Sequence, residues 1–210
     1  MSEKTMKYIL LASIAGNFAN NLRSICEAKG IVLQALFITT AANPYKEKQW
    51  MEDDIALFTS AGFSIERVDI AGLTKEEFVL QLSKTTICIM GGGNPIYLLE
   101  VITEKDVMSS LQKRVAEGML YVGSSAGAVI TSPNIKLEKH FEDRTEVTPL
   151  DSYDSLGLVN FQVLPHWGKP SYEKEYMQML QDAYRNKETV IPLRDDQAIE
   201  ILDDKMRLIT

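Results

Sequence analysis

A pair of serines stands between two glycines in the stretch GSSAG (residues 123–127), which follows the apolar run that starts at Met119. Gly123-x-Ser125-x-Gly127 matches the nucleophile elbow, in which a sharp turn between a strand and a helix exposes a serine hydroxyl. A plain glycine turn is the alternative, but the apolar run before it and the helix-like "SAGAVITS" after it favour the elbow. We therefore take Ser125 as the candidate nucleophile, and Ser124 as the weaker one because it occupies an x position.

A second glycine-rich loop, "MGGGNP" (residues 90–95), follows the apolar run "TTICI". Glycines let backbone N–H groups approach a ligand closely, so this loop could form a phosphate cradle or an oxyanion hole. The dinucleotide fingerprint G-x-G-x-x-G fails because Ile96 stands at its last position, and the P-loop pattern is absent. In the oxyanion reading, a loop N–H would act together with the N–H of the residue after Ser125. A turn without any ligand role remains a third reading.

A nucleophilic serine needs a base, and the chain has only two histidines. His140 lies in "LEKHFEDR" among charged residues, so we expect it to be solvated. His166 follows the apolar run "VNFQVLP", which places it at the end of an expected strand. A lone histidine is often structural, but this position makes His166 the predicted general base.

The third member of such a triad is a carboxylate that orients the imidazole and stabilises its charged form. Asp195 and Asp196 come directly after the apolar run "VIPL", where a strand is expected to end. Asp151 and Asp154 are alternatives in the irregular segment before His166. The spacing alone leaves the choice among these four open, since paired aspartates are often only a solvated turn.

The elements that must position these residues alternate between strand and helix patterns, which predicts an α/β fold. The strands are nearly continuous apolar runs, typical of a mostly parallel sheet with helices on both faces. Ligands bind such sheets beyond the carboxyl ends of the strands, where the motifs above fall. Strands are expected at residues 6–14, 31–39, 63–70, 85–90, 119–123, 158–165, 188–193 and 197–210. Helices are expected at residues 17–30, 43–62, 74–84, 94–102, 105–118, 125–132 and 171–186, with residues 136–157 irregular.

Composition places the chain among ordinary globular proteins, and we expect one domain over residues 1–210. The net charge of −7 argues against nucleic acid or an anionic membrane as the partner. Cys26 and Cys88 fit buried apolar positions and imply no disulfide framework. The apolar part of residues 6–14 is only about eight residues long, so we read it as a core strand rather than a secretory signal. No stretch has the roughly 20 apolar residues of a spanning helix, and a cytoplasmic location is expected.

Four motifs in this order, "MGGGNP", "GSSAGAVI", "LPHW" and "LRDDQA", resemble the peptidase E (aspartyl dipeptidase) family of serine peptidases. The resemblance covers the chain from about Lys7 to its C-terminus and implies a three-layer fold similar to the class I glutamine amidotransferases. It implies Ser125 as nucleophile, His166 as base and Asp195 as acid, with Asp196 the alternative acid. The oxyanion donors would be the N–H groups of Gly93 or Gly92 and of Ala126. No metal or organic cofactor is expected.

The resemblance also implies a short peptide substrate, with an N-terminal aspartate as one candidate. A basic residue after the histidine would hold that aspartate, and this stretch contains Lys169, Lys174 and Arg185. We expect Lys169 and Asn94 to contact the substrate, and we expect a monomer or a homodimer. Two other functions stay open: a small α/β-hydrolase-type esterase, and a non-catalytic domain that binds a small anion at "MGGGNP". The lack of a cysteine in the elbow argues against a glutamine amidotransferase proper.

Overall fold

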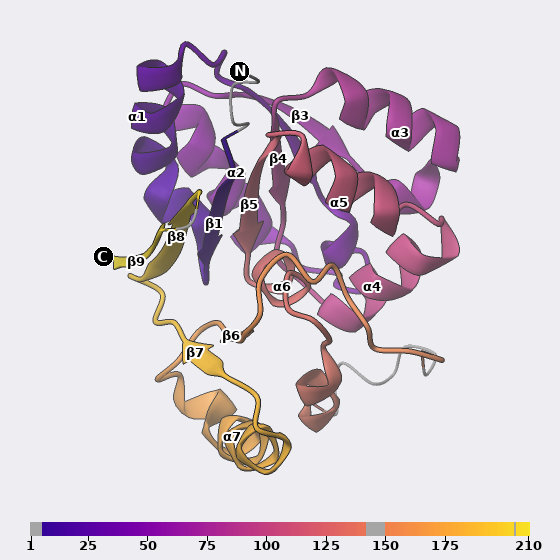
Figure 1. The fold of residues 1–210 in the computed structure, drawn as a ribbon, viewed down its shortest axis with the longest axis vertical. Coiled ribbons are helices and arrows are strands. Elements are labelled where there is room, and N and C mark those ends of the chain that lie inside the picture. The colour runs from indigo at the N-terminus through magenta and orange to yellow at the C-terminus, as the bar shows by residue number, and fades with distance from the viewer. Residues whose placement is uncertain (1–5, 142–149, 204) are drawn as a thin grey trace.

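A computed structural model describes residues 6–141, 150–203 and 205–210. Within them, the main feature is a seven-stranded sheet whose first five strands are parallel (Figure 1). The last two strands run antiparallel at the edge, where β8 pairs with β1 and β9 with β8. In spatial order the strands are β3 (Ser64–Val68), β2 (Gln34–Ile38), β4 (Ile87–Met90), β5 (Leu120–Ser124), β1 (Tyr8–Ala12), β8 (Ala198–Leu202) and β9 (Lys205–Ile209).

Helices cover both faces of this sheet, because its central strands are buried on both sides. Along β1, Ile9 and Leu11 pack into one apolar cluster, whereas Tyr8 and Leu10 pack into the other. The Tyr8 cluster includes α1 (Ala19–Lys29) and α2 (Gln49–Ser60). The Ile9 cluster includes α3 (Lys75–Lys84), α4 (Pro95–Glu104), α5 (Met108–Ala116) and α6 (Ala126–Val129). The predicted three-layer α/β arrangement is therefore confirmed.

A smaller unit lies beyond the carboxyl ends of the main strands (Figure 1). It contains a parallel two-stranded sheet made of β6 (Gln162–Leu164) and β7 (Val190–Pro192), and the helix α7 (Glu173–Asn186) that connects them. Side chains of α7 form a third apolar cluster with Leu164 of β6 and with Leu137 and Phe141. This unit carries the segments that follow β6 and β7, where His166 and Asp195 lie.

Local signals explain several boundaries. Thr74 and Glu77 form the predicted capping box at the start of α3. Two other helices begin later than predicted: α1 starts at Ala19 after a 3-10 turn over Ala15–Phe18, and α2 starts at Gln49 rather than near Asn43. The strand predicted at 158–165 shortens to three residues and pairs with β7 instead of the main sheet.

Other sequence-based expectations have mixed outcomes. Cys26 and Cys88 are both buried and unpaired, as predicted. The irregular segment 136–157 contains a 3-10 turn over Lys136–His140, while its residues 142–149 lie outside the described ranges. In the part of the chain that the structure describes, every helix is too short or too polar to cross a lipid bilayer.

Candidate active site

The turn after β5 holds Ser125 in a backbone conformation that side chains rarely adopt, with φ 49° and ψ −109°. Its N–H donates to the carbonyl of Ala12 at the end of β1, at 2.9 Å. Glycine is required on both sides of this turn because a side chain at either position would collide with neighbouring backbone atoms. A Cβ on Gly123 would lie 2.5 Å from the Gly127 carbonyl oxygen, and one on Gly127 would lie 2.0 Å from that of Met90. The G-x-S-x-G pattern thus reflects a turn packed directly against the neighbouring strands.

Ser124 points away from the exposed side of the turn. It is buried, and its hydroxyl accepts a hydrogen bond from the N–H of Ala15 at 3.1 Å. The same hydroxyl bonds to the carboxyl group of Asp54, which also accepts from the N–H of Gly16. Burial raises the pKa of Asp54, and these two bonds oppose that rise. Ser124 is therefore part of the packing behind the elbow, which leaves Ser125 as the accessible hydroxyl.

His166 lies beside Ser125, and its imidazole joins the serine to a carboxylate. His166 Nε2 is 3.0 Å from Ser125 Oγ, and His166 Nδ1 is 2.6 Å from Asp195 Oδ1. His166 and Asp195 follow β6 and β7, whose residues Leu164 and Pro192 are paired in register. Because the carboxyl ends of paired parallel strands meet at one edge, the two side chains arrive together.

The other candidates are placed elsewhere. Asp196 pairs with Arg194, with 3.0 Å between the carboxylate and Arg194 Nε. His140 was expected to be solvated, but its Nε2 lies 2.9 Å from Asp182 on α7. The backbone of Asp154 forms an isolated antiparallel β-bridge with that of Asn134. Of the four predicted acids, Asp195 is the one whose carboxylate the structure places on His166 Nδ1.

A lysine completes the charge pattern around Asp195. Lys169 Nζ lies 3.2 Å from Asp195 Oδ2 and 3.3 Å from His166 Nδ1. If Nδ1 carries the proton that it shares with Asp195, the acceptor for the ammonium group is the carboxylate. Burial alone would raise the pKa of Asp195, but the hydrogen bond and charge of His166, followed by Lys169, outweigh it and lower that pKa below its ordinary value. The arrangement keeps the carboxylate ionised.

The glycine loop after β4 borders Ser125 on another side. A Cβ on Gly92 would lie 3.3 Å from Ser125 Cβ, so the loop and the elbow are in contact. Gly93 has φ 136°, and a Cβ there would lie 2.0 Å from the carbonyl oxygen of Ala41, so only glycine fits. Among the described residues, the N–H groups of Gly92, Gly93 and Ala126 donate to no protein acceptor. They therefore remain the candidates for the predicted oxyanion donors.

Asn94, predicted to contact the substrate, has a structural role in this loop. Its side chain is buried, and its Oδ1 accepts from the N–H groups of Ile96 and Tyr97 at the start of α4. This is an N-cap, which sequences typically place before a helix that begins with proline. The predicted substrate contacts of Asn94 and of Lys169 remain predictions.

Sequence reasoning missed three residues near the site. Ser13 and Asn17, in the turn after β1, hydrogen-bond to the segments that carry His166 and Asp195. Trp50 on α2 is 41% exposed, and its Cζ3 lies 3.4 Å from where a Cβ of Gly92 would be. The Trp50 ring and Ser125 therefore border the same face of Gly92. Tyr45 contacts this ring edge-on, with 6.0 Å between centroids.

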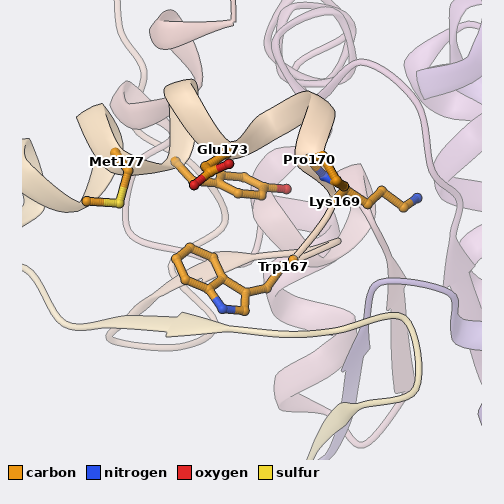
Figure 2. Close-up of a pocket in the computed structure, with 7 residues that line it drawn as sticks. Trp167, Lys169, Pro170, Glu173 and Met177 are labelled. Atoms are coloured by element: carbon orange, nitrogen blue, oxygen red, sulfur yellow. The ribbon is translucent and has the colours of Figure 1, made fainter.

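The residues that directly follow His166 in the sequence line a pocket of about 300 Å³ together with residues of α7 (Figure 2). Trp167 forms one wall, opposite Glu173 and Met177 of α7, and Lys169 points away from that end of the pocket. The Trp167 ring stacks on Tyr176 with 5.5 Å between centroids. Within residues 6–141, 150–203 and 205–210, no group of three His, Cys, Asp or Glu side chains is placed to hold a metal ion.

Comparisons with known proteins agree on one family. The model of peptidase family S51 matches residues 12–209. An uncharacterised peptidase of Listeria monocytogenes is 33% identical over 165 residues, covering 79% of this chain and 80% of the relative. Peptidase E of Salmonella arizonae is 30% identical over 134 residues, which cover 63% of this chain and 55% of that protein.

Solved structures share the fold. A crystal structure of a candidate peptidase E protein from Listeria monocytogenes matches with a TM-score of 0.83 and 27% identity over 98% of both chains. A peptidase from an acI-B1 actinobacterium matches with a TM-score of 0.70 and 19% identity, over 98% of this chain and 88% of that one. The predicted class I glutamine amidotransferase-like architecture is thereby confirmed.

Proposed function

This chain belongs to peptidase family S51, a family of serine peptidases, and from that premise we propose that it hydrolyses short peptides by acyl transfer. In this proposal Ser125 is the nucleophile, His166 the general base and Asp195 the orienting acid. The observation that carries it is the continuous hydrogen-bonded chain from Asp195 through His166 to Ser125, at 2.6 and 3.0 Å. The order Ser, His, acid along the chain also differs from that of α/β-hydrolase esterases, in which the acid precedes the histidine.

The mechanism follows from these positions. His166 Nε2 takes the proton from Ser125 Oγ as the oxygen attacks the peptide carbonyl carbon. The negative charge that develops on the carbonyl oxygen is bound by the N–H of Ala126 together with that of Gly93 or Gly92. His166 then gives its proton to the leaving amine, and the C–N bond breaks. Water, deprotonated by His166, hydrolyses the acyl-enzyme and restores Ser125.

Asp195 serves throughout this cycle without changing its own protonation. Its bond to Nδ1 keeps the tautomer that leaves Nε2 free to accept a proton, and its charge stabilises the imidazolium. The lowered pKa of Asp195 keeps the carboxylate ionised at neutral pH. The buried packing of Ser124 and the strained turn hold the nucleophile in place behind this pair.

The proposal extends to dipeptides with an N-terminal aspartate, for which Lys169 would be the cation. Lys169 keeps 44% of its side chain exposed while it contacts Asp195. A substrate carboxylate would therefore share this ammonium group with Asp195. Aspartate preference then depends on Lys169, whereas cleavage of other peptides requires the triad and the oxyanion donors but no substrate contact with Lys169.

Turnover of a dipeptide panel that varies the first residue, measured on the purified chain and on Ser125→Ala, tests the proposal. We expect the wild-type chain to cleave at least one dipeptide, and we expect kcat to be lower in Ser125→Ala by a factor on the order of 10⁶. A fluorophosphonate should label the wild-type chain at Ser125 and fail to label Ser125→Ala. A folded wild-type chain that is neither labelled nor active on any peptide would refute the peptidase mechanism. Cleavage of other peptides but not of aspartate-first ones would remove only the aspartate extension.

A further inference from the structure

The last residue of β1 and the turn that follows it contact all three segments that carry the proposed triad. The carbonyl of Ala12 accepts from the N–H of Ser125 at 2.9 Å. The hydroxyl of Ser13 accepts from the N–H of His166 at 2.8 Å. The side-chain amide of Asn17 donates to the carbonyl of Asp195 at 3.0 Å. Six consecutive residues, 12–17, thus hold the backbone at each reacting position.

Ser13 occupies the centre of this arrangement. It is 1% exposed, and its hydroxyl donates to the Leu193 carbonyl at 2.9 Å while it accepts from His166. The Arg194 carbonyl lies 3.2 Å away and is an alternative acceptor. A hydroxyl has one proton to donate and lone pairs to accept, so Ser13 can make both bonds at once. Ser13 directly follows β1, so its hydroxyl links the end of β1 to the backbone of His166 and to Leu193, the residue after β7.

The backbone of His166 needs such a partner. Its φ is 64°, in the left-handed region that is unfavourable for a residue with a side chain. Strained conformations of this kind persist only where the surroundings fix them. The bond to Ser13 holds the N–H of His166, and the bonds from the imidazole to Asp195 and Ser125 hold its other end. Without Ser13, the backbone could relax and the imidazole would turn away from Ser125.

We propose that Ser13 is a positioning residue for His166, and that Asn17 supports Asp195 in the same way. Neither side chain acts on the reacting atoms in this proposal, which rests on the proposed peptidase function. Because catalysis depends on geometry more steeply than substrate binding does, a displacement of about 1 Å can cost about 100-fold in rate. Loss of Ser13 should therefore lower kcat and leave KM nearly unchanged.

The test compares Ser13→Ala with Ser155→Ala as a matched control. Ser155 is also buried, and its hydroxyl donates to the Ile130 carbonyl at 2.6 Å, so both variants lose a buried hydroxyl that donates to a backbone carbonyl. We expect kcat to fall about 10- to 100-fold in Ser13→Ala, with KM within about twofold. Labelling of Ser125 by a fluorophosphonate should slow by the same factor. Ser155→Ala should match the wild-type chain in both assays although it also loses thermal stability.

Histidine NMR gives a readout that does not depend on turnover. The chain has two histidines, so ¹⁵N-labelled imidazoles give a signal from His166 and an internal reference from His140. In a Ser125→Ala background, Ser13→Ala should shift or broaden the signal of the Nδ1 proton shared with Asp195, and leave His140 unchanged.

An unaltered His166 signal together with wild-type kcat in Ser13→Ala would overturn this inference. Equal losses of kcat in Ser13→Ala and Ser155→Ala would also overturn it, because they would indicate general destabilisation. Both outcomes are distinct from failure of the peptidase proposal, in which the wild-type chain itself would show neither turnover nor labelling.

Discussion

Asp195 Oδ1 lies 2.6 Å from His166 Nδ1, although the two residues are separated by the whole of helix α7. They meet because β6 and β7 are paired in parallel and both chains leave the small sheet at the same edge. The length of this contact indicates a charge-assisted hydrogen bond, which is stronger and more directional than one between neutral groups.

Asp195→Asn should lower kcat by about 10³–10⁴ with little loss of stability. An amide at this position can present its NH₂ group to Nδ1, which favours the tautomer that cannot accept the serine proton at Nε2. Asp196→Asn is the matched control, since Asp196 pairs with the exposed Arg194 and should leave kcat within about twofold. Steady-state kinetics on both variants decide which aspartate is the acid, and a larger loss in Asp196→Asn would contradict the assignment of Asp195.

Lys169→Met should move the acidic limb of the kcat/KM profile to higher pH. The wild-type pKa of Asp195 is lowered in part by Lys169, so this substitution raises it toward its ordinary value. Removal of a cation 3.3 Å from Nδ1 also makes protonation of the imidazole easier, which acts in the same direction. The shift is expected to be larger at low ionic strength, where the charge of the half-exposed lysine is screened less.

Lys174→Met removes the same charge from the chain and should leave that profile in place. The stability effect of Asp195 has a defined sign as well. Its folded-state pKa lies below its unfolded one, so its ionisation stabilises the fold above the unfolded value, and this contribution is lost as pH falls through the folded value. An unshifted kcat/KM profile in Lys169→Met would show that the lysine does not influence the pair.

Gly127→Ala should destabilise the chain by about 1–3 kcal/mol or more, because the new methyl group would lie 2.0 Å from the Met90 carbonyl oxygen. Gly72→Ala is the control, since no atom lies within 4 Å of its added Cβ. Denaturant unfolding followed by circular dichroism measures both. Equal midpoints for the two variants would mean that α6 can move away from β4 at little cost.

Trp50→Ala should raise KM for short peptides about three- to tenfold and affect kcat less. The ring is exposed beside Gly92, within reach of a peptide bound at Ser125, and offers a flat apolar surface. Leu80→Ala on α3 removes another exposed apolar side chain and is expected to change neither parameter. If KM stays at its wild-type value in Trp50→Ala, the substrate does not contact this ring.

The main candidates for the site could be identified from sequence because each has a strong local signal. The G-x-S-x-G turn and the "GGGNP" loop sit after apolar strands, and a chain with two histidines offers little choice of base. The choice between Asp195 and Asp196 could not be made from spacing, because the two residues are adjacent in a turn, closed by the Gln197 N–H to the Arg194 carbonyl, and the direction of each side chain depends on how that turn packs. The structure places the carboxylate of Asp195 beside His166 and that of Asp196 beside Arg194.

The contacts of Asn17 and Ser13 and the pairing of β6 could not be predicted, because they depend on residues far away in the sequence. Asn17 reads as a helix cap, yet α1 starts at Ala19 and the amide of Asn17 bonds to Asp195. Ser13 belongs to no motif, and its role depends on two segments more than 150 residues away. Periodicity could not show that β6 lies outside the main sheet, since a short apolar run carries no information about its partner.

The proposed nucleophile and the groups proposed to activate it lie on separate parts of the fold. Ser125 ends a strand of the main sheet, whereas His166 and Asp195 extend from a two-stranded sheet with its own apolar cluster around α7. Substitutions confined to the small unit of β6, α7 and β7 could therefore abolish or alter this chemistry. Descendants altered in that way would keep the complete main core and an intact elbow, and would pass for enzymes in any survey based on the serine motif.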